Sequence, residues 1–167
     1  MVCDMIRAIR TADCDAIAAI EAETFNTALD RGRLLTFMKV PAFCGFVDDT
    51  NIPKIPNTAD KQNNLDNPCI LTGYLLATTT VDEAEILSIA VSANHQKCGR
   101  GTGLLRHFLA YIVAQDVKTV FLEVAADNLS ALTLYHRHGF AEFGRRPSYY
   151  KRSDGDCDAI LMRRFSD

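Results

Sequence analysis

Hydrophobic and polar positions in the first part of the chain predict two strands and two helices. Residues 5–9 alternate apolar and polar side chains, as in a strand with one buried face. Asp13 can cap a helix that follows, because Ile17 and Ile20 share one face with residues 24 and 25. Residues 29–38 predict a shorter helix, and residues 43–47 predict a second short strand.

Residues 47–68 interrupt this pattern. They contain three of the chain's five prolines and five of its asparagines, with few large apolar side chains. Such a segment buries too little apolar surface to offset the entropy of ordering it, so we expect a long flexible loop. A long connection within a hairpin is the simpler interpretation, and a lid over a binding site is the alternative.

The pattern is clearer after this segment. Residues 69–79 and 85–91 predict adjacent strands joined by a turn around residues 81–83. A helix over residues 101–115 presents one apolar face, which is expected to be buried. Its apolar side chains are Leu104, Leu105, Phe108, Leu109, Ile112 and Val113. Residues 119–124 form a nearly unbroken apolar run, which is typical of a central strand covered on both faces.

A further helix is predicted over residues 128–138. Asp127 or Asn128 can cap its first turn, because both side chains accept hydrogen bonds from backbone amides. Gly139 can end it, because glycine adopts the left-handed conformation that often closes a helix.

Two more strands, over residues 140–146 and 157–165, predict a hairpin with Asp154-Gly155 as its turn signal. The strand–helix–strand step between residues 87 and 124 requires a parallel crossover, whereas hairpins require antiparallel pairs. We therefore expect an α/β fold (α+β in some schemes) with a mixed, mostly antiparallel sheet of about seven strands and helices on both faces. The whole chain, residues 1–167, is expected to form a single domain.

Composition narrows the possible functions. The chain of 167 residues is 48% hydrophobic and 23% charged, close to the averages of soluble globular proteins. No apolar run approaches the ~18 residues of a membrane-spanning helix, and Asp4 and Arg7 stand where a signal peptide would need an apolar core. We therefore expect a cytoplasmic protein that does not bind membranes. The net charge of −3 argues against non-specific nucleic-acid binding and is compatible with a cationic substrate.

The six cysteines lie far apart in the sequence. They form no Cys-x-x-Cys pair and no Cys/His spacing of the zinc type. We therefore expect reduced thiols that serve mostly as small core residues, with no disulfide framework and no metal.

The first candidate ligand site is the loop of residues 95–103, which reads His-Gln-Lys-Cys-Gly-Arg-Gly-Thr-Gly. Its three glycines lie where a strand leads into a helix, so backbone amides can converge on an anion and the helix dipole favours negative charge. Lys97 and Arg100 add positive charge. This combination favours a diphosphate group as the ligand, and a glycine-rich turn with solvated cations is the alternative.

Glu123 and Tyr135 are candidates for proton transfer. Glu123 lies near the end of an apolar strand, where a charge needs either solvent or a cationic partner. Tyr135 lies on the following helix, where an ordinary core tyrosine with a hydrogen-bonded hydroxyl is the alternative. Ligands of open α/β sheets bind at the carboxyl ends of parallel strands, and the glycine-rich loop, Glu123 and Asn128 would all lie at that edge.

At these positions the chain resembles the Gcn5-related N-acetyltransferase (GNAT) superfamily, and within it the ribosomal-protein-alanine N-acetyltransferase (RimI) subfamily. The resemblance covers residues 83–164 well and the first helix loosely. It rests on blocks in the family's order: Leu-Ser-Ile-Ala-Val at 87–91, Gln-Lys-Cys-Gly-Arg-Gly-Thr-Gly-Leu-Leu at 96–105, Leu-Glu-Val at 122–124, Asn-x-x-Ala-x-x-Leu-Tyr-x-x-x-Gly-Phe at 128–140, Arg-Arg-Pro-Ser-Tyr-Tyr at 145–150 and Asp-Gly-x-x-Asp-Ala-Ile-x-Met at 154–162.

The resemblance implies an acetyl-CoA-dependent N-acetyltransferase, whose cofactor lies in a cleft where two parallel strands splay apart. The residues it assigns to acetyl-CoA are Ile89, Ala90, Val91, Gln96, Lys97, Cys98, Gly99, Arg100, Gly101, Thr102 and Asn128. It makes Glu123 the general base and Tyr135 the general acid for direct attack by a primary amine. The implied acceptor is the α-amine of a protein N-terminus, such as that of a ribosomal protein. Tyr149 and Tyr150 on the last hairpin are candidates for lining the acceptor site, and they suit a peptide and a small amine equally well. No metal is implied, and Cys98 need not act as a nucleophile.

The chain departs from the subfamily at three places, all on the expected acceptor side. Ala125 stands where the subfamily has arginine, Phe25-Asn26-Thr27 replaces Phe-Pro-Trp, and residues 47–68 exceed the usual short turn. Three alternatives therefore stay open. The acceptor could be a small-molecule amine or a lysine side chain, or the chain could be a non-catalytic regulatory domain that binds acyl-CoA.

Overall fold

The computed structural model describes residues 4–25, 28–50, 70–152 and 155–166. In chain order the elements are β1 (Asp4–Ala8), a 3-10 turn (Thr11–Asp13), α1 (Cys14–Thr24), α2 (Arg31–Phe37), β2 (Phe43–Thr50), β3 (Ile70–Thr79), β4 (Glu83–Val91), a second 3-10 turn (Ala93–His95), α3 (Arg100–Ala114), β5 (Thr119–Ala125), α4 (Leu129–Arg137), β6 (Ala141–Tyr150) and β7 (Cys157–Phe165). Within these ranges, the order of strands and helices is the one that the sequence predicts.

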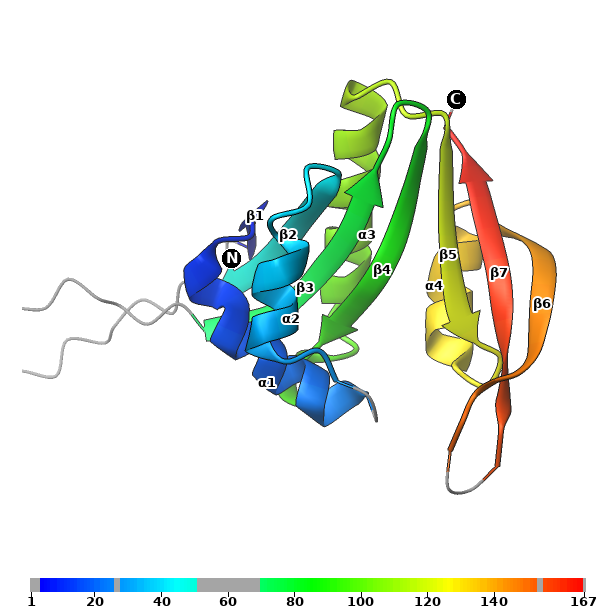
Figure 1. The fold of residues 1–167 in the computed structure, drawn as a ribbon, viewed down its shortest axis with the longest axis horizontal. Coiled ribbons are helices and arrows are strands. Elements are labelled where there is room, and N and C mark those ends of the chain that lie inside the picture. Colours follow the sequence, from blue (N-terminus) through cyan, green and yellow to red (C-terminus); the bar gives the residue numbers. More distant parts are fainter. Residues whose placement is uncertain (1–3, 26–27, 51–69, 153–154, 167) are drawn as a thin grey trace, which may run out of the picture.

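The strands form one sheet in the order β1-β2-β3-β4-β5-β7-β6 (Figure 1). The neighbours β4 and β5 are parallel, and every other pair of neighbours in the sheet is antiparallel. α3 forms the crossover between β4 and β5. The predicted mixed, mostly antiparallel sheet with one parallel pair is therefore confirmed.

Two hydrophobic cores lie on opposite faces of this sheet. On one face α3 and α4 cover the strands, and Phe108 packs in a core with Leu122. On the other face α1 and α2 place Ile17 and Leu34 against Tyr74 of β3. Figure 1 shows α1 and α2 in front of the half of the sheet that contains β2, β3 and β4, whereas none of the helices in the described ranges lies in front of β5, β7 and β6. One face of the second half of the sheet is therefore open.

The parallel pair β4 and β5 separates halfway along its length. Its register begins at Glu83 with Thr119 and stops at Ile86 with Leu122. Just beyond, β4 carries a bulge, because Ile86 and Ser88 pair with consecutive residues of β3 and Leu87 is left over. From there β4 stays with β3, while β5 follows β7 to its end. The two strands therefore diverge toward their carboxyl ends, as Figure 1 shows.

Three sequence predictions are corrected on the sheet and on α3. β2 continues to Thr50, so residues 48–50 belong to a strand and not to the predicted loop. Composition misses this because the aspartates of this strand end are buried and each pairs with an arginine. The strand predicted to be covered on both faces has only one covered face, since Val120, Leu122 and Val124 are buried while the alternate residues of β5 are partly exposed. Val113 is also exposed, because it lies past the edge of the apolar face of α3.

Asp13 is the residue that precedes α1, but its side chain does not cap the helix. Its carboxylate instead accepts hydrogen bonds from the Arg7 guanidinium and from the backbone N–H of Arg10. The expected long loop, apart from its first residues, and the turn residue Asp154 lie outside the described residues, as does Cys69.

Candidate functional site

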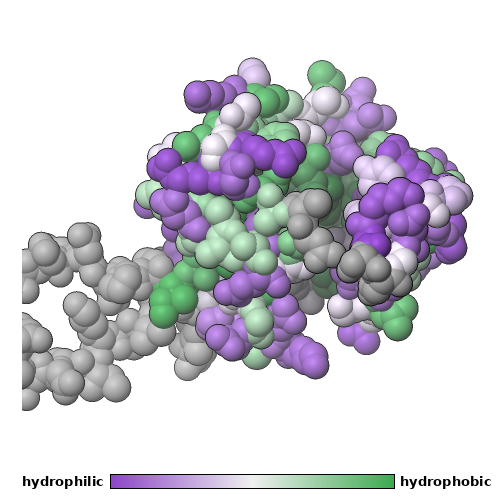
Figure 2. Space-filling model, turned by 60° about the horizontal axis from the view of Figure 1, so that its bottom comes forward, coloured by the Kyte–Doolittle hydropathy of each residue, from purple (hydrophilic) through white to green (hydrophobic). Residues whose placement is uncertain are grey.

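Two cavities meet at the point where β4 and β5 separate. One, here called the loop pocket, has a volume of about 390 Å³ and lies between the loop before α3, the end of β4 and one side of α4. The other, here called the strand groove, has a volume of about 560 Å³ and lies between the diverging strands, α1, α2 and the end of β6. Ile89 and Tyr135 line both cavities. Figure 2 looks toward this end of the molecule and shows a hollow between the helical part and the part built on β5, β6 and β7.

The glycine-rich loop turns sharply into α3. Lys97 and Gly99 both have positive φ, of 60° and 82°, and the helix begins at Arg100. The N–H of Gly103 donates to the carbonyl oxygen of Gly99 at 2.9 Å, so the amides of the first turn precede the first intrahelical hydrogen bond. A Cβ on Gly99 would have no atom within 4 Å, so the loop is open at this point. An anion can therefore approach the positive end of the helix dipole.

The end of β4 forms one wall of the loop pocket. Ile89, Ala90 and Val91 line it, and β5 has already left this edge of β4. The side-chain amide of Gln96 donates to the carbonyl oxygen of Val91 at 3.0 Å and so ties the loop to the strand. An extended chain with amide groups can pair with such an open strand edge.

The positive charge of Arg100, which the sequence assigns to the glycine-rich loop, is already paired with another residue inside the protein. Its guanidinium is 2.9 Å from the Asp48 carboxylate and 3.1 Å from the Thr72 hydroxyl, and its side chain is 11% exposed. Its positive charge is therefore matched by a buried carboxylate on β2. Lys97 is exposed and lines the pocket.

Glu123 lies on the open face of β5 and lines the strand groove. Its Oε1 is 3.1 Å from Nη2 of Arg146 on β6, and its side chain is 23% exposed. The carboxylate is therefore accessible to solvent and also has a cationic partner. Both conditions that the sequence allows for a charge on this strand are met.

Tyr135 lies on α4 between the two cavities and is 4% exposed. Burial raises the pKa of its phenol above the ordinary value, and the nearby Tyr150 adds to this rise. Its ring packs edge-on against Phe140 with the ring centroids 5.6 Å apart. Tyr135 therefore carries its proton at neutral pH and is held in place by packing.

Two aromatic side chains from β6 line the strand groove. Tyr149 and Tyr150 pack edge-on with their ring centroids 5.1 Å apart, and the Arg146 guanidinium lies 5.4 Å from the centre of the Tyr149 ring. Burial raises the pKa of Tyr150, and the carboxylate of Glu123 contributes to the rise. Both tyrosines thus line the same groove as Glu123.

Glu21 of α1 is a groove residue that the sequence reasoning missed. It is 3% exposed, and its carboxylate accepts hydrogen bonds from the hydroxyls of Tyr74 and Ser88 and from the backbone N–H of Leu29. Its spacing of four residues from Ile17 could have indicated a position on the buried face of the helix.

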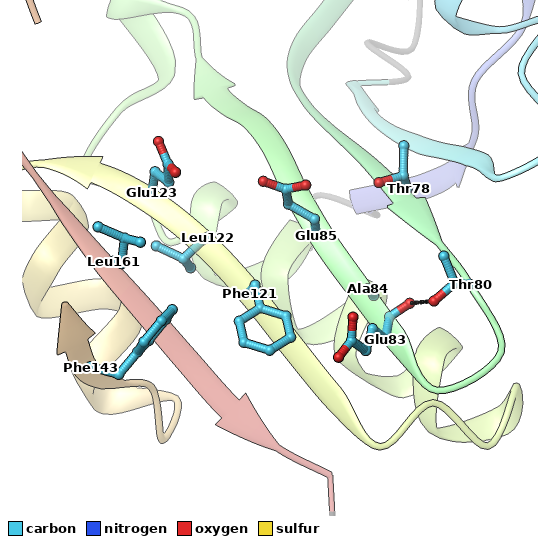
Figure 3. A pocket seen from close by; sticks show the side chains of 10 residues that line it. All are labelled: Thr78, Thr80, Glu83, Ala84, Glu85, Phe121, Leu122, Glu123, Phe143 and Leu161. Carbon is cyan, nitrogen blue, oxygen red and sulfur yellow. Dashed lines mark hydrogen bonds between the residues drawn. The ribbon is translucent and has the colours of Figure 1, made fainter. Parts of the chain in front are cut away.

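A third cavity, here called the acidic groove, continues from Glu123 along the open face of the sheet. It has a volume of about 280 Å³ and includes Glu83 and Glu85 of β4 and Phe121 of β5. Figure 3 shows Glu85 and Glu123 on the neighbouring strands β4 and β5, with the Glu83 backbone joined to Thr80 by a hydrogen bond. This groove and the strand groove share Glu123, so Glu83, Glu85 and Glu123 lie along one continuous surface.

The structure brings most of the predicted site residues together. Those assigned to acetyl-CoA line the loop pocket except Cys98 and Asn128, and the remaining predicted residues line the strand groove. Asn128 instead caps α4, because its side-chain oxygen accepts from the N–H of Ala131 at 3.1 Å and from the Ser130 hydroxyl. Cys98 is exposed.

The described residues contain no group of three or more His, Cys, Asp or Glu side chains that could hold a metal ion. Among the helices in these same ranges, none combines the length and apolar composition needed to cross a bilayer.

Residues 58–140 of the chain match the sequence model of the acetyltransferase (GNAT) family. The [ribosomal protein bS18]-alanine N-acetyltransferase of Escherichia coli strain K12 is 37% identical over 92 residues, which are 55% of this chain and 62% of that enzyme. The match therefore spans less than two thirds of the length of this relative.

Solved structures extend the similarity over the whole fold. The ribosomal-protein-S18-alanine N-acetyltransferase from Escherichia coli superposes with a TM-score of 0.80 and 26% identity, covering 97% of this chain and 93% of that chain. Arabidopsis thaliana NAA60 in complex with acetyl-CoA shares the fold, with a TM-score of 0.77 and 17% identity over 97% of this chain and 98% of that chain.

Proposed function

We propose that this chain, which belongs to the GNAT acetyltransferase family, transfers the acetyl group of acetyl-CoA to the α-amine of a protein N-terminus. The observation that carries the proposal is the meeting of two cavities at Ile89 and Tyr135. One cavity has the features of an anion site at the start of a helix, and the other contains an accessible carboxylate, Glu123. A transferase needs such an arrangement, because its two substrates must meet at one point.

The loop pocket fits acetyl-CoA in its charged and its extended parts. The amides at the start of α3 and the Lys97 ammonium would bind the diphosphate. The open edge of β4 at residues 89–91 would pair with the amides of the pantetheine arm. This arm would direct the thioester toward the gap between β4 and β5, where the strand groove begins. When bound, the coenzyme supplies the activated acetyl group.

Glu123 would prepare the acceptor for attack. An amine at neutral pH is mostly an ammonium ion and cannot attack a carbonyl carbon until it loses a proton. Glu123 accepts that proton, directly or through water, and the freed nitrogen forms the new bond to the acetyl carbon. A backbone N–H of the Ala90–Val91 region of β4 would stabilise the negative charge that develops on the carbonyl oxygen.

Tyr135 would complete the transfer. The carbon–sulfur bond breaks as the amide forms, and the departing sulfur takes a proton from the Tyr135 hydroxyl. The raised pKa of this phenol keeps the proton available at neutral pH. The nitrogen of the new amide still carries one proton too many, and this proton passes through water to the Tyr135 oxygen, while Glu123 releases the first proton to solvent. No group of the enzyme is acylated, so Cys98 needs no part in the reaction.

Two observations support a polypeptide acceptor. The relative from Escherichia coli is named as an N-acetyltransferase of an alanine in ribosomal protein bS18. The strand groove also continues into the acidic groove, so a chain that enters at Glu123 can extend past Glu85 and Glu83. Ala125 removes the arginine of the subfamily from the groove wall, so the sequence of the acceptor is expected to differ from that of the relative's substrate.

An acceptor screen tests the proposal. Thiol release from acetyl-CoA is measured with peptides that have free N-termini, with N-blocked lysine peptides and with small amines. We expect the free N-termini to react fastest, and Glu123→Gln to lower the best rate at least about tenfold. Turnover with small amines or lysine alone would change the acceptor. Coenzyme binding without turnover on any amine would indicate a regulatory domain instead.

A further inference from the structure

We infer that Arg100 is a positioning residue for the anion site, because it neutralises the buried carboxylate of Asp48 behind the start of α3. The inference rests on the proposed function only in naming the diphosphate of acetyl-CoA as the anion. Arg100 would then act from inside the protein, and its role would differ from that of Lys97, whose charge faces the pocket.

The geometry of this cluster is fixed by three hydrogen bonds. Arg100 Nη1 donates to Asp48 Oδ2 at 2.9 Å and to Thr72 Oγ1 at 3.1 Å, and Thr72 Oγ1 donates to the Asp48 carbonyl oxygen at 3.0 Å. Asp48 is 1% exposed and Thr72 is fully buried. The cluster therefore lies inside the protein, where solvent screens charge only weakly.

Asp48 is close to the anion site in the sheet as well. It pairs with Gly73 of β3, and Gly73 pairs with Val91 of β4, which lines the loop pocket. From the other direction, the residue that binds Asp48 is the first residue of α3. The carboxylate therefore lies within the length of one arginine side chain of the helix start.

The helix start cannot easily move away from this charge. A Cβ on Gly73 would come 3.1 Å from Leu104 Cδ1 and 2.9 Å from the Ala90 carbonyl oxygen, so the first turns of α3 pack closely on β3 and β4. Asp48 Oδ1 is buried and has no hydrogen-bond partner among the described residues. Without Arg100, the negative charge of this carboxylate would cancel part of the positive potential at the start of α3 and would repel a bound diphosphate.

Two substitutions have opposite expected effects on coenzyme binding. Arg100→Met leaves the negative charge of Asp48 and should weaken acetyl-CoA binding about tenfold. Asp48→Asn leaves the positive charge of Arg100 and should keep or tighten binding. The double variant has neither charge and should return to within about threefold of the wild type. A merely structural cluster would instead weaken binding in both single variants.

The neighbouring pair of Arg7 and Asp49 provides a matched control. Asp49 is 2% exposed, and its Oδ2 is 2.7 Å from Arg7 Nε. Arg7 also pairs with Asp13, which precedes α1, so this pair lies beside α1, whereas Arg100 belongs to α3. Arg7→Met should therefore lower thermal stability, as Arg100→Met should, and leave coenzyme affinity unchanged. This control separates loss of fold stability from loss of the anion site.

Calorimetry with acetyl-CoA, with inorganic diphosphate and with an acetyl-pantetheine thioester completes the experiment. The Arg100→Met defect should appear with the first two ligands and be absent with the third, which carries no diphosphate. Equal affinity of Arg100→Met and wild type for inorganic diphosphate, or weaker binding by Asp48→Asn, would overturn the inference. A chain whose diphosphate affinity depends on Arg100 but which acetylates no amine would keep the inference and overturn the transferase proposal. If Arg100→Met does not fold, Asp48→Asn and the double variant still show whether removing the charge of Asp48 keeps or weakens diphosphate binding.

Discussion

Arg146 and Glu123 form an ion pair across the open face of the sheet, with Nη2 and Oε1 3.1 Å apart. The arginine is 51% exposed, and exposed ion pairs of this kind contribute at most about 1 kcal/mol. Breaking the ion pair between Arg146 and Glu123 therefore requires little free energy. An acceptor ammonium that reaches Glu123 has to compete with this guanidinium, because Arg146 occupies the position on the carboxylate that the ammonium would take.

Arg146→Met should lower the KM for a peptide acceptor by about two- to fivefold, because it removes this competitor while keeping the aliphatic stem. Steady-state kinetics with varied acceptor and saturating acetyl-CoA measure the effect. Arg145→Met is the matched control, since Arg145 pairs with Asp158 at 3.3 Å and not with Glu123. A higher KM in Arg146→Met alone would mean that Arg146 binds the acceptor directly.

Tyr135→Phe should lower kcat at least about tenfold, because it removes the proton donor for the departing sulfur. The ring remains and can still pack against Phe140, so thermal stability should change little. The defect should shrink when acetyl-CoA is replaced by a thioester with a more acidic thiol, which needs less help from an acid. An equal defect with both thioesters would contradict the assigned role.

The stability of the fold should decrease at alkaline pH. Burial raises the pKa of both Tyr135 and Tyr74 in the folded state, and burial raises the pKa of Cys44 to about 11. The unfolded chain therefore loses these protons at lower pH than the folded chain, and stability present below about pH 9 is lost as pH rises further. Thermal unfolding from about pH 8 to 11 measures this decrease, which Tyr135→Phe should make less steep. A flat profile would contradict it.

The acidic groove should select acceptors with basic residues after the reactive amine. Glu83→Gln/Glu85→Gln should raise the KM for such peptides roughly three- to tenfold at low salt and leave neutral peptides unaffected. Peptide pairs that differ only in lysine or alanine at the second to fourth positions measure this. Glu142→Gln is the control, because Glu142 on β6 lies beside His136 of α4 and does not line the groove. Equal effects on both peptides would show that the groove is not used.

The sequence predicts the sheet well because each of its strands is marked by a pattern of neighbouring residues. The apolar run that ends at Val124 and the amphipathic face of α3 can each be recognised from neighbouring residues alone, and the parallel crossover follows from their order. The glycine-rich loop is likewise a local pattern, and residue type alone predicts an anion site there.

What the sequence does not reveal depends on long-range contacts. Asp48 has the composition of a loop residue and is buried only because Arg100, 52 positions away, neutralises it. Glu21 is a groove residue because Tyr74 and Ser88 donate to it from other strands. Glu123 has an open environment because none of the described helices covers this face of β5, which the apolar run cannot indicate.

A crystal structure of the chain with bound acetyl-CoA tests the central claim most directly. The account predicts the diphosphate on the amides at the start of α3, near Gly101, and the thioester in the gap between β4 and β5, within reach of Glu123 and Tyr135. Coenzyme bound at any other surface, with this gap left unfilled at saturating concentration, would contradict it.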